Sequence, residues 1–312
     1  MKKVIAAVFL STSVLLSAGT AMGEYPEKPV NFIVPWPPGD LEDVLTRMIA
    51  EDFQAKYGVA AAVVNKPGGG GGPFPGAIDV ATADADGYTI GSFVIAVPAI
   101  GHNIGIPELA PEKFDPLGIF LTYPFVLATA KNSPYSTMQE LAEHAKSSKV
   151  ALGHFGAPLP PTRATLAFAK NAGFEWGSDA AFDALDCNTL ASGDADVINT
   201  TLQLIMPCLD DITILATITD QRIAIIPDVP TLGEIDPSLN LALWNGLFVR
   251  KETPADVRQK IIDVAKATVM SDRAQAVAKN TGALIYWQDA DASAERIVAD
   301  RATLGRIGEI LQ

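Results

Sequence analysis

The stretch VNFIVPWPPGDLEDVLTRMIAEDFQAKY, residues 30–57, decides the fold. Its first five residues form a mostly apolar run between Pro29 and Pro35, which is typical of a strand. After the loop, Asp40 is placed to cap a helix over about residues 41–57, because six apolar residues recur there at helical spacing: Leu41, Val44, Leu45, Met48, Ile49 and Phe53. A strand that leads through a short loop into a helix is the first unit of a helix-covered parallel sheet.

The same alternation continues along the chain. Further strands are predicted near residues 60–64, 88–94, 150–152, 196–198, 212–218, 241–249 and 283–286. Helices are predicted near residues 41–57, 137–147 and 254–270, with two more after Ser271. A Pro- and Gly-rich stretch at 98–118, followed by an apolar run at 119–130, marks a boundary between two lobes. We therefore expect an α/β fold with a central, mostly parallel sheet in each lobe.

The first 23 residues read as a secretory signal. Lys2 and Lys3 supply the positive start, an apolar core follows, and Ala21-Met22-Gly23 offers small residues at the cleavage site. We predict cleavage near Gly23, with a cut after Ala21 as the alternative. A retained anchor is disfavoured because the apolar core is short for a membrane span and no cysteine follows to accept a lipid.

Composition excludes several function classes. The chain is 48% hydrophobic and 19% charged, as expected of a folded globular protein. It has 36 acidic against 23 basic residues, so we expect no nucleic-acid partner and no anionic membrane surface. Two cysteines, Cys187 and Cys208, either close one disulfide in an oxidising compartment or stay as two isolated buried thiols.

The two glycine- and proline-rich loops lack the motifs of known cofactor sites. The run PGGGGGP at residues 67–73 has no Gly-Lys-Ser/Thr, and Pro73, Phe74 and Pro75 break the dinucleotide pattern. Its amides can approach a small ligand closely, although a flexible surface loop has the same composition. The loop at 35–40 joins a strand end to a helix N-terminus, the usual ligand position. No hydrolase motif or metal-ligand spacing occurs, so we predict no catalytic residue, metal or cofactor.

An ordered set of short motifs resembles the Bug-type receptors, the periplasmic solute-binding components of tripartite tricarboxylate transporters. The motifs are YPEKPV (25–30), VPW (34–36), DVLTR (43–47), VNKPG (64–68), DGYT (86–89), PDVPTL (227–232) and TP (253–254). They run along essentially the whole predicted mature chain. Such an ordered set is far more specific than any single motif.

The resemblance implies a periplasmic, monomeric Venus-flytrap protein without catalytic activity. Residues 24–124 and 236–312 would form one lobe and residues 125–235 the other, closing on a small-molecule ligand for membrane permease subunits. Family ligands are usually small carboxylates held by backbone amides. The implied ligand-binding residues are Trp36, Pro38, Gly39, Asp40, Gly70, Gly71, Gly72, Phe74, His154, Phe155, Gly156, Ala157, Asp183 and Asn199.

Several acidic residues depart from the family pattern. Asp40 and Glu42 stand where the family usually has small or hydroxyl residues, and Asp179, Asp183 and Asp186 gather in the second lobe. A carboxylate that faces the cleft would repel a carboxylate ligand and favour a cationic or zwitterionic one. If these acids point to solvent instead, the carboxylate expectation stands.

Two other functions share the same context. A sensor would pass the ligand-bound state to a membrane signalling partner. An enzyme would need a nucleophile and a base in the cleft, such as Cys187 with His154.

Overall fold

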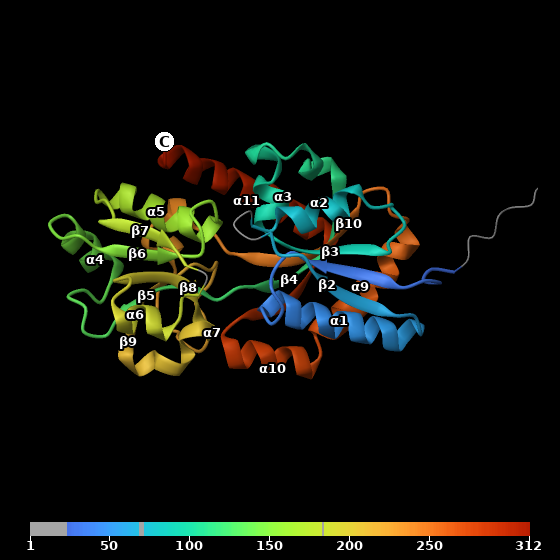
Figure 1. Cartoon of the computed structure of the whole chain (residues 1–312), viewed down its shortest axis with the longest axis horizontal. Coiled ribbons are helices and arrows are strands. Elements are labelled where there is room, and N and C mark those ends of the chain that lie inside the picture. Colours follow the sequence, from blue (N-terminus) through green and yellow to red (C-terminus); the bar gives the residue numbers. More distant parts are fainter. Residues whose placement is uncertain (1–23, 69–71, 183) are drawn as a thin grey trace, which may run out of the picture.

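The computed structural model describes residues 24–68, 72–182 and 184–312, and shows two α/β lobes side by side (Figure 1). The first sheet has the order β11-β4-β10-β3-β1-β2 and the second β7-β6-β8-β5-β9. The first contains β1 (Val30–Val34), β2 (Ala61–Asn65), β3 (Thr89–Val94), β4 (Phe114–Thr122), β10 (Trp244–Arg250) and β11 (Leu284–Asp289). The second contains β5 (Phe125–Ala130), β6 (Ala151–His154), β7 (Ser178–Ala181), β8 (Val197–Thr201) and β9 (Ile212–Thr217).

Helices cover both sheets. Around the first lie α1 (Leu41–Tyr57), α2 (Phe74–Thr82), α3 (Ala96–Ile100), α9 (Ala255–Val269), α10 (Asp272–Thr281) and α11 (Ala290–Ile310). Around the second lie α4 (Met138–Ala145), α5 (Pro160–Ala172), α6 (Cys187–Ser192), α7 (Leu202–Ile205) and α8 (Leu232–Ile235). Short 3-10 turns are η2 (His102–Ile104), η3 (Pro107–Leu109), η4 (Pro111–Lys113), η5 (Met206–Asp211) and η6 (Pro237–Leu239). The C-terminal helix α11 runs from the first lobe to α5 of the second (Figure 1).

The opening strand and helix form where the sequence predicts them. β1 and α1 have the predicted bounds, and Leu45, Ile49 and Phe53 of α1 are fully buried. Gly58 ends the helix in the left-handed region at φ +71°, which glycine adopts without steric cost. The stretch at 98–118, expected only as a Pro- and Gly-rich connection, contains the end of α3 and three short 3-10 turns.

Both sheets are mixed, which corrects the expectation of mostly parallel pairing. β1 pairs parallel with β2 and β3, whereas β10 pairs antiparallel with β3 and β4, and β11 antiparallel with β4. In the second sheet β6 pairs parallel with β7 and β8, but β5 pairs antiparallel with β8 and β9. The reason is that the chain crosses between the lobes. β5 begins beside the last residue of β8, and β10 begins beside the last residue of β4. Each of the two strands therefore runs antiparallel to that neighbour.

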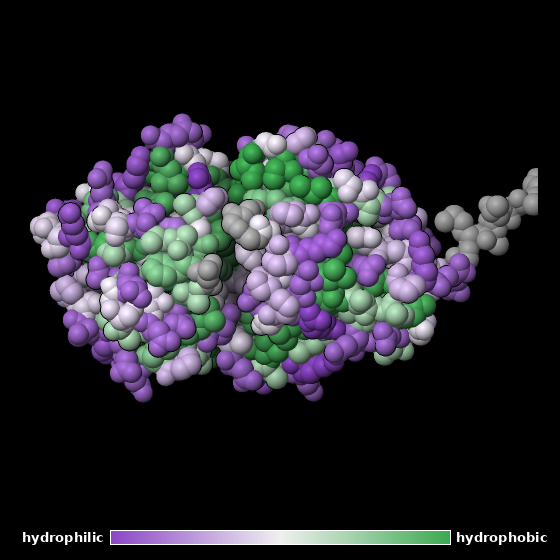
Figure 2. Space-filling model, viewed as in Figure 1, coloured by the Kyte–Doolittle hydropathy of each residue, from purple (hydrophilic) through white to green (hydrophobic). Residues whose placement is uncertain are grey.

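The crossing segments place the carboxyl ends of the parallel strands at the junction between the lobes. Only Tyr123 and Pro124 separate β4 from β5, and the Tyr123 N–H donates to the Leu243 carbonyl at 2.7 Å. Phe125 lies opposite Thr201 at the end of β8. The loops after β1, β2, β6 and β8 therefore meet at this junction, and Figure 2 shows the surface hollowed there.

A disulfide joins Cys187, at the start of α6, to Cys208 in η5, with Cα atoms 5.9 Å apart. Of the two arrangements that the sequence left open, the structure shows the disulfide. It ties together two segments of the second lobe, from cysteines that are 21 positions apart in the sequence. Among the described residues, no helix combines the length and apolar character needed to cross a membrane.

Candidate functional site

The loop between β1 and α1 forms one side of the junction. Gly39 has φ +98°, a conformation that favours glycine, and Pro38, Gly39 and Asp40 are exposed. Trp36 is half-buried, and its indole Nε1 is buried without a hydrogen-bond partner in the described part of the chain. Asp40 occupies the N-cap position but forms no side-chain capping bond, contrary to expectation. The positive end of the α1 dipole therefore faces the junction without a cap from that carboxylate.

Asp43 holds this loop in place. Its buried carboxylate accepts hydrogen bonds from the Gly39 N–H at 2.9 Å, from Arg47 Nε and Nη2 at 2.9 Å each, and from Asn65 Nδ2 at 2.8 Å. Burial alone would raise the pKa of Asp43, but these hydrogen bonds outweigh it and lower the pKa. Asn65 also donates to the Trp36 carbonyl at 3.0 Å, so the end of β2 and the start of α1 fix the same loop.

A second acidic residue of the first turn, Glu42, is buried at the junction and is 3% exposed. Its Oε2 lies 2.9 Å from the hydroxyl of Tyr123, which stands between the two lobes. From Tyr123 the contacts continue to Asn245 Oδ1, from Asn245 Nδ2 to Ser92 Oγ, and from Ser92 to Thr46 Oγ1. Burial raises the pKa of Glu42 to about 8, and the carboxylate of Asp40 adds to the rise.

In the sequence, Glu42 stands out only as a departure from the family pattern, and the polar cluster around it is not predicted. A signal was present, because Glu42, Thr46, Ile49 and Phe53 follow one another at helical spacing on the buried face of α1. A carboxyl group on that stripe has to be buried with a partner. Which partner, here Tyr123 from a crossing segment, cannot be read from the spacing.

The structure describes only part of the glycine-rich stretch. Gly70 and Gly71 lie outside the described residues, as does the second-lobe residue Asp183. Gly72 has φ +66°, and Phe74 begins α2, half-buried against the core. A Cβ at Gly68 would collide with the Gly72 carbonyl oxygen, which explains why that position needs glycine.

In the second lobe, His154 is buried and holds the loop after β6. The ring is 2% exposed, Nδ1 accepts the Gly156 N–H at 3.0 Å, and Nε2 lies 3.1 Å from Asp179 Oδ1. Both ring nitrogens are therefore used within the lobe. The half-buried Phe155 packs edge-on against Phe125 with ring centroids 6.4 Å apart, and Ala157 is exposed. Phe155, Gly156 and Ala157 remain the accessible part of this loop.

Asn199 lies deeper in the second lobe than the sequence suggests. It is 1% exposed, and its Nδ2 donates to Thr165 Oγ1 at 2.7 Å. Its Oδ1 has no hydrogen-bond partner within the described ranges. The neighbouring helix α5 begins with Pro160 and Pro161, which lack N–H groups, so its first turn offers fewer amide donors than α1 does.

The pairing of a free Cys187 thiol with His154, which the enzyme alternative requires, does not form. Cys187 is bonded to Cys208, so its sulfur is not a free thiolate beside His154. In the described part of the chain, no three His, Cys, Asp or Glu side chains are grouped so that they could hold a metal ion. What the junction does offer is a helix N-terminus, a fixed loop and aromatic surface, which suit non-covalent capture of a small molecule.

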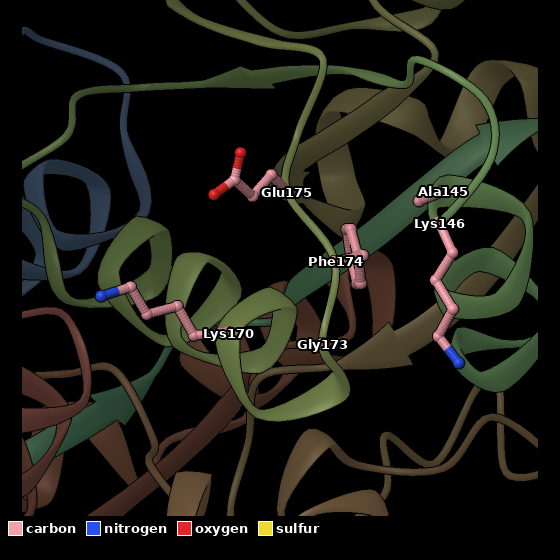
Figure 3. Close-up of a pocket in the computed structure, with 6 residues that line it drawn as sticks. All are labelled: Ala145, Lys146, Lys170, Gly173, Phe174 and Glu175. Atoms are coloured by element: carbon pink, nitrogen blue, oxygen red, sulfur yellow. The ribbon is translucent and has the colours of Figure 1, made fainter.

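A second hollow lies at the far end of the second lobe, between α4 and the C-terminal end of α5. It has a volume of about 480 Å³ and is lined by Ala145, Lys146, Lys170, Gly173, Phe174 and Glu175. Figure 3 shows Lys146 and Lys170 pointing away from each other, so no set of charges converges there. Lys146 Nζ pairs with Glu143 Oε2 at 2.7 Å. This hollow is open surface without the preorganised groups of the junction.

Comparison with known proteins points to one family. A family model described as "Tripartite tricarboxylate transporter family receptor" matches residues 45–312. The match begins just after Glu42, so the unusual loop and first helical turn lie outside it. A UPF0065 protein from the TAR-I ttuE-ttuC' intergenic region of Agrobacterium vitis is 27% identical over 281 residues, covering 84% of this chain and 78% of the relative.

Solved structures share the fold. An R. palustris protein with adipate superposes with a TM-score of 0.77 at 22% identity, covering 92% of this chain and 98% of that one. MatC from Rhodopseudomonas palustris with bound malate gives a TM-score of 0.74 at 20% identity, covering 92% and 100%. At these identities the likeness shows the two-lobed fold.

Proposed function

The chain belongs to the tripartite tricarboxylate transporter receptor family, and on that basis we propose that it captures a small organic carboxylate between its lobes. The observation that carries the proposal is the N-terminus of α1, which faces the junction without a side-chain cap from Asp40. Its first-turn amides and dipole favour an anion at that position. The relatives with adipate and malate bound are consistent with this ligand class.

The charges around this helix end are compatible with a carboxylate. Asp43 is balanced by two hydrogen bonds from Arg47, and Asp40 is an exposed residue. Phe155 to Ala157 of the second lobe would close on the ligand from the other side. Trp36 Nε1, buried without a partner in the described chain, is a further donor for a ligand oxygen.

The same proposal covers export and delivery. The signal at residues 1–23 would direct the chain to the periplasm, and cleavage would release a receptor that presents its ligand to membrane permease subunits. Hinge motion at Tyr123-Pro124, the short crossing between the sheets, would open and close the lobes.

A matched set of ligands tests the proposal. Residues 24–312 are heated with adipate, 1,6-hexanediol or 1,6-diaminohexane, which share a six-carbon chain but carry carboxylate, hydroxyl or ammonium ends. A ligand at about 100 times its Kd stabilises the native state by about 2.7 kcal/mol, which is visible as a raised melting temperature. We expect stabilisation by dicarboxylates alone. Stabilisation by the diamine and not by any dicarboxylate would overturn the carboxylate proposal in favour of a cationic ligand.

A variant localises the binding. Asp43→Asn removes the charge that holds Arg47 and weakens the anchor of the Gly39 amide, so it should reduce dicarboxylate affinity. Glu175→Gln removes one acidic charge at the far end of the second lobe, where Glu175 is exposed, and serves as the matched control. Equal affinity in both variants would place binding away from the α1 loop.

A further inference from the structure

We propose that Glu42 is a protonated carboxylic acid in the working receptor, and that loss of this proton closes the site to carboxylate ligands. The inference rests on the proposed function for its ligand class. Glu42 departs from the family pattern in the sequence, and it lies outside residues 45–312, which the family model matches. The inference is supported by the geometry of the polar cluster at the lobe junction.

The contacts of the Tyr123 hydroxyl indicate which group holds the proton. The hydroxyl oxygen lies 2.9 Å from Glu42 Oε2 and 3.4 Å from Asn245 Oδ1. Asn245 donates through Nδ2 to Ser92 Oγ at 2.7 Å, which leaves Oδ1 as the acceptor that faces Tyr123. A hydroxyl has a single hydrogen, so it cannot donate to both oxygens. With the Asn245 amide in this orientation, both contacts are hydrogen bonds when protonated Glu42 donates to Tyr123, which then donates to Asn245.

Burial and the neighbouring carboxylates favour the neutral form of Glu42, and together they outweigh the hydrogen bonds that an ionised carboxylate would accept from its own backbone N–H and from Tyr123. Tyr123 comes from the crossing segment, and Asn245 of β10 and Ser92 of β3 complete an uncharged polar chain. The charged neighbours on its own side are the carboxylates of Asp40 and Asp43, both of which raise its pKa. Among the described residues Glu42 forms no ion pair, and burial of an unpaired carboxylate is costly.

The position of Glu42 couples this proton to the ligand. Glu42 is the second residue of α1, so an ionised side chain would place a negative charge beside the first-turn amides. That charge would offset the positive potential of the helix N-terminus at the point where a ligand carboxylate binds, and it would repel the ligand directly. Neutral Glu42 avoids both effects. Affinity for a carboxylate should therefore fall as the pH rises through the Glu42 titration.

The size of the effect follows from single-proton linkage. When the ligand binds only the protonated form, affinity falls about tenfold for each pH unit above the titration midpoint. With a pKa of about 8, the Kd of the best dicarboxylate should rise about 30-fold between pH 6.5 and pH 9.5. A cationic ligand would show the opposite slope, because it would favour ionised Glu42.

Titration calorimetry with the wild type and Glu42→Gln tests the proposal. The glutamine amide donates to Tyr123 as the protonated acid does but cannot ionise, so its Kd should change less than about threefold over the same range. Glu175→Gln, the exposed control, should keep the wild-type slope. Parallel slopes in wild type and Glu42→Gln would overturn the proposal.

An infrared titration without ligand separates this inference from the proposed function. The carbonyl band that a protonated Glu42 contributes should disappear from the wild type between pH 6.5 and pH 9.5, and Glu42→Gln should lack that contribution throughout this range. If no dicarboxylate binds at pH 6.5, the proposed function fails, while the band still reports the Glu42 proton. If the wild type lacks the band at pH 6.5, Glu42 is ionised and the inference fails, whatever binds.

Tyr123→Phe gives a second variant that keeps Glu42. It removes the hydroxyl that accepts a hydrogen bond from protonated Glu42 and donates one to Asn245, and it leaves the ring in place. We expect the midpoint of the infrared titration to move. An unchanged midpoint would show that Tyr123 does not interact with the titrating group, and would overturn the hydrogen-bond argument.

Discussion

Replacement of Glu42 by glutamine should stabilise the protein, and by an amount that grows with pH. A glutamate in the unfolded chain has a pKa near 4.5, whereas burial raises the pKa of Glu42 to about 8 in the folded state. Between these values the native state binds the proton that the unfolded state has lost, so the free energy of unfolding falls as the pH rises. Glutamine carries no such proton and avoids the loss.

The magnitude follows from 1.36 kcal/mol for each unit of pKa difference. Relative to a protein in which residue 42 stays neutral, the free energy of unfolding of the wild type should be lower by about 1 kcal/mol at pH 5. The difference should be about 3 kcal/mol at pH 7 and about 5 kcal/mol at pH 9. The free energy of unfolding of Glu42→Gln should exceed that of the wild type by a difference that grows in the same way.

Urea unfolding at the three pH values measures this difference directly. Both proteins should show the same m-value, so the shift in midpoint reports stability alone. Glu175→Gln provides the control for removal of an exposed acid. A stability difference between wild type and Glu42→Gln that stays constant from pH 5 to pH 9 would refute the reasoning, because it would mean that Glu42 ionises as readily in the native state as in the unfolded chain.

Three other perturbations test the packing around the site. Replacement of both Cys187 and Cys208 by serine should lower the free energy of unfolding by about 3 kcal/mol, as expected for release of a loop of this length. Urea melts of the wild type with and without reductant should show the same difference. Asp43→Asn should cost about 2 kcal/mol at pH 7 by weakening charged hydrogen bonds, and the cost should shrink as acid protonates the wild-type carboxylate, whose pKa is lowered. Gly87→Ala should lower the free energy of unfolding by more than 3 kcal/mol in thermal melts, because the φ of +80° is strained for alanine and the added Cβ would collide with α9. Gly58→Ala is the control: its φ is +71° but the surrounding space is open, so it should cost only about 1 kcal/mol.

Local patterns in the sequence predict the opening of the fold closely. Pro29 and Pro35 bound the first strand, and apolar spacing predicts α1 to the residue. Sheet pairing is harder to predict, because the direction of β5 and β10 depends on where the chain crosses between lobes. The first crossing, before β5, takes place in Tyr123 and Pro124, which carry no periodic signal of their own, and the return crossing precedes β10 within residues 218–243.

The candidate site was predictable only at the level of loops. The loop after β1 and the loop after β6 lie at the junction, as their strand-end positions suggest. Side-chain roles were less accessible, because they depend on distant partners. His154 uses both ring nitrogens within its own lobe, and Glu42 is buried against Tyr123 from 81 positions away. Neither partner can be identified from the local sequence.

The most direct test of the central claim is a crystal structure of residues 24–312 with the dicarboxylate that binds most tightly. The account predicts one ligand carboxylate within hydrogen-bond distance of the backbone amides at residues 41–43, with Phe155 to Ala157 closed over it. Density for the ligand at another place, such as the hollow lined by Lys146 and Lys170, would contradict the account.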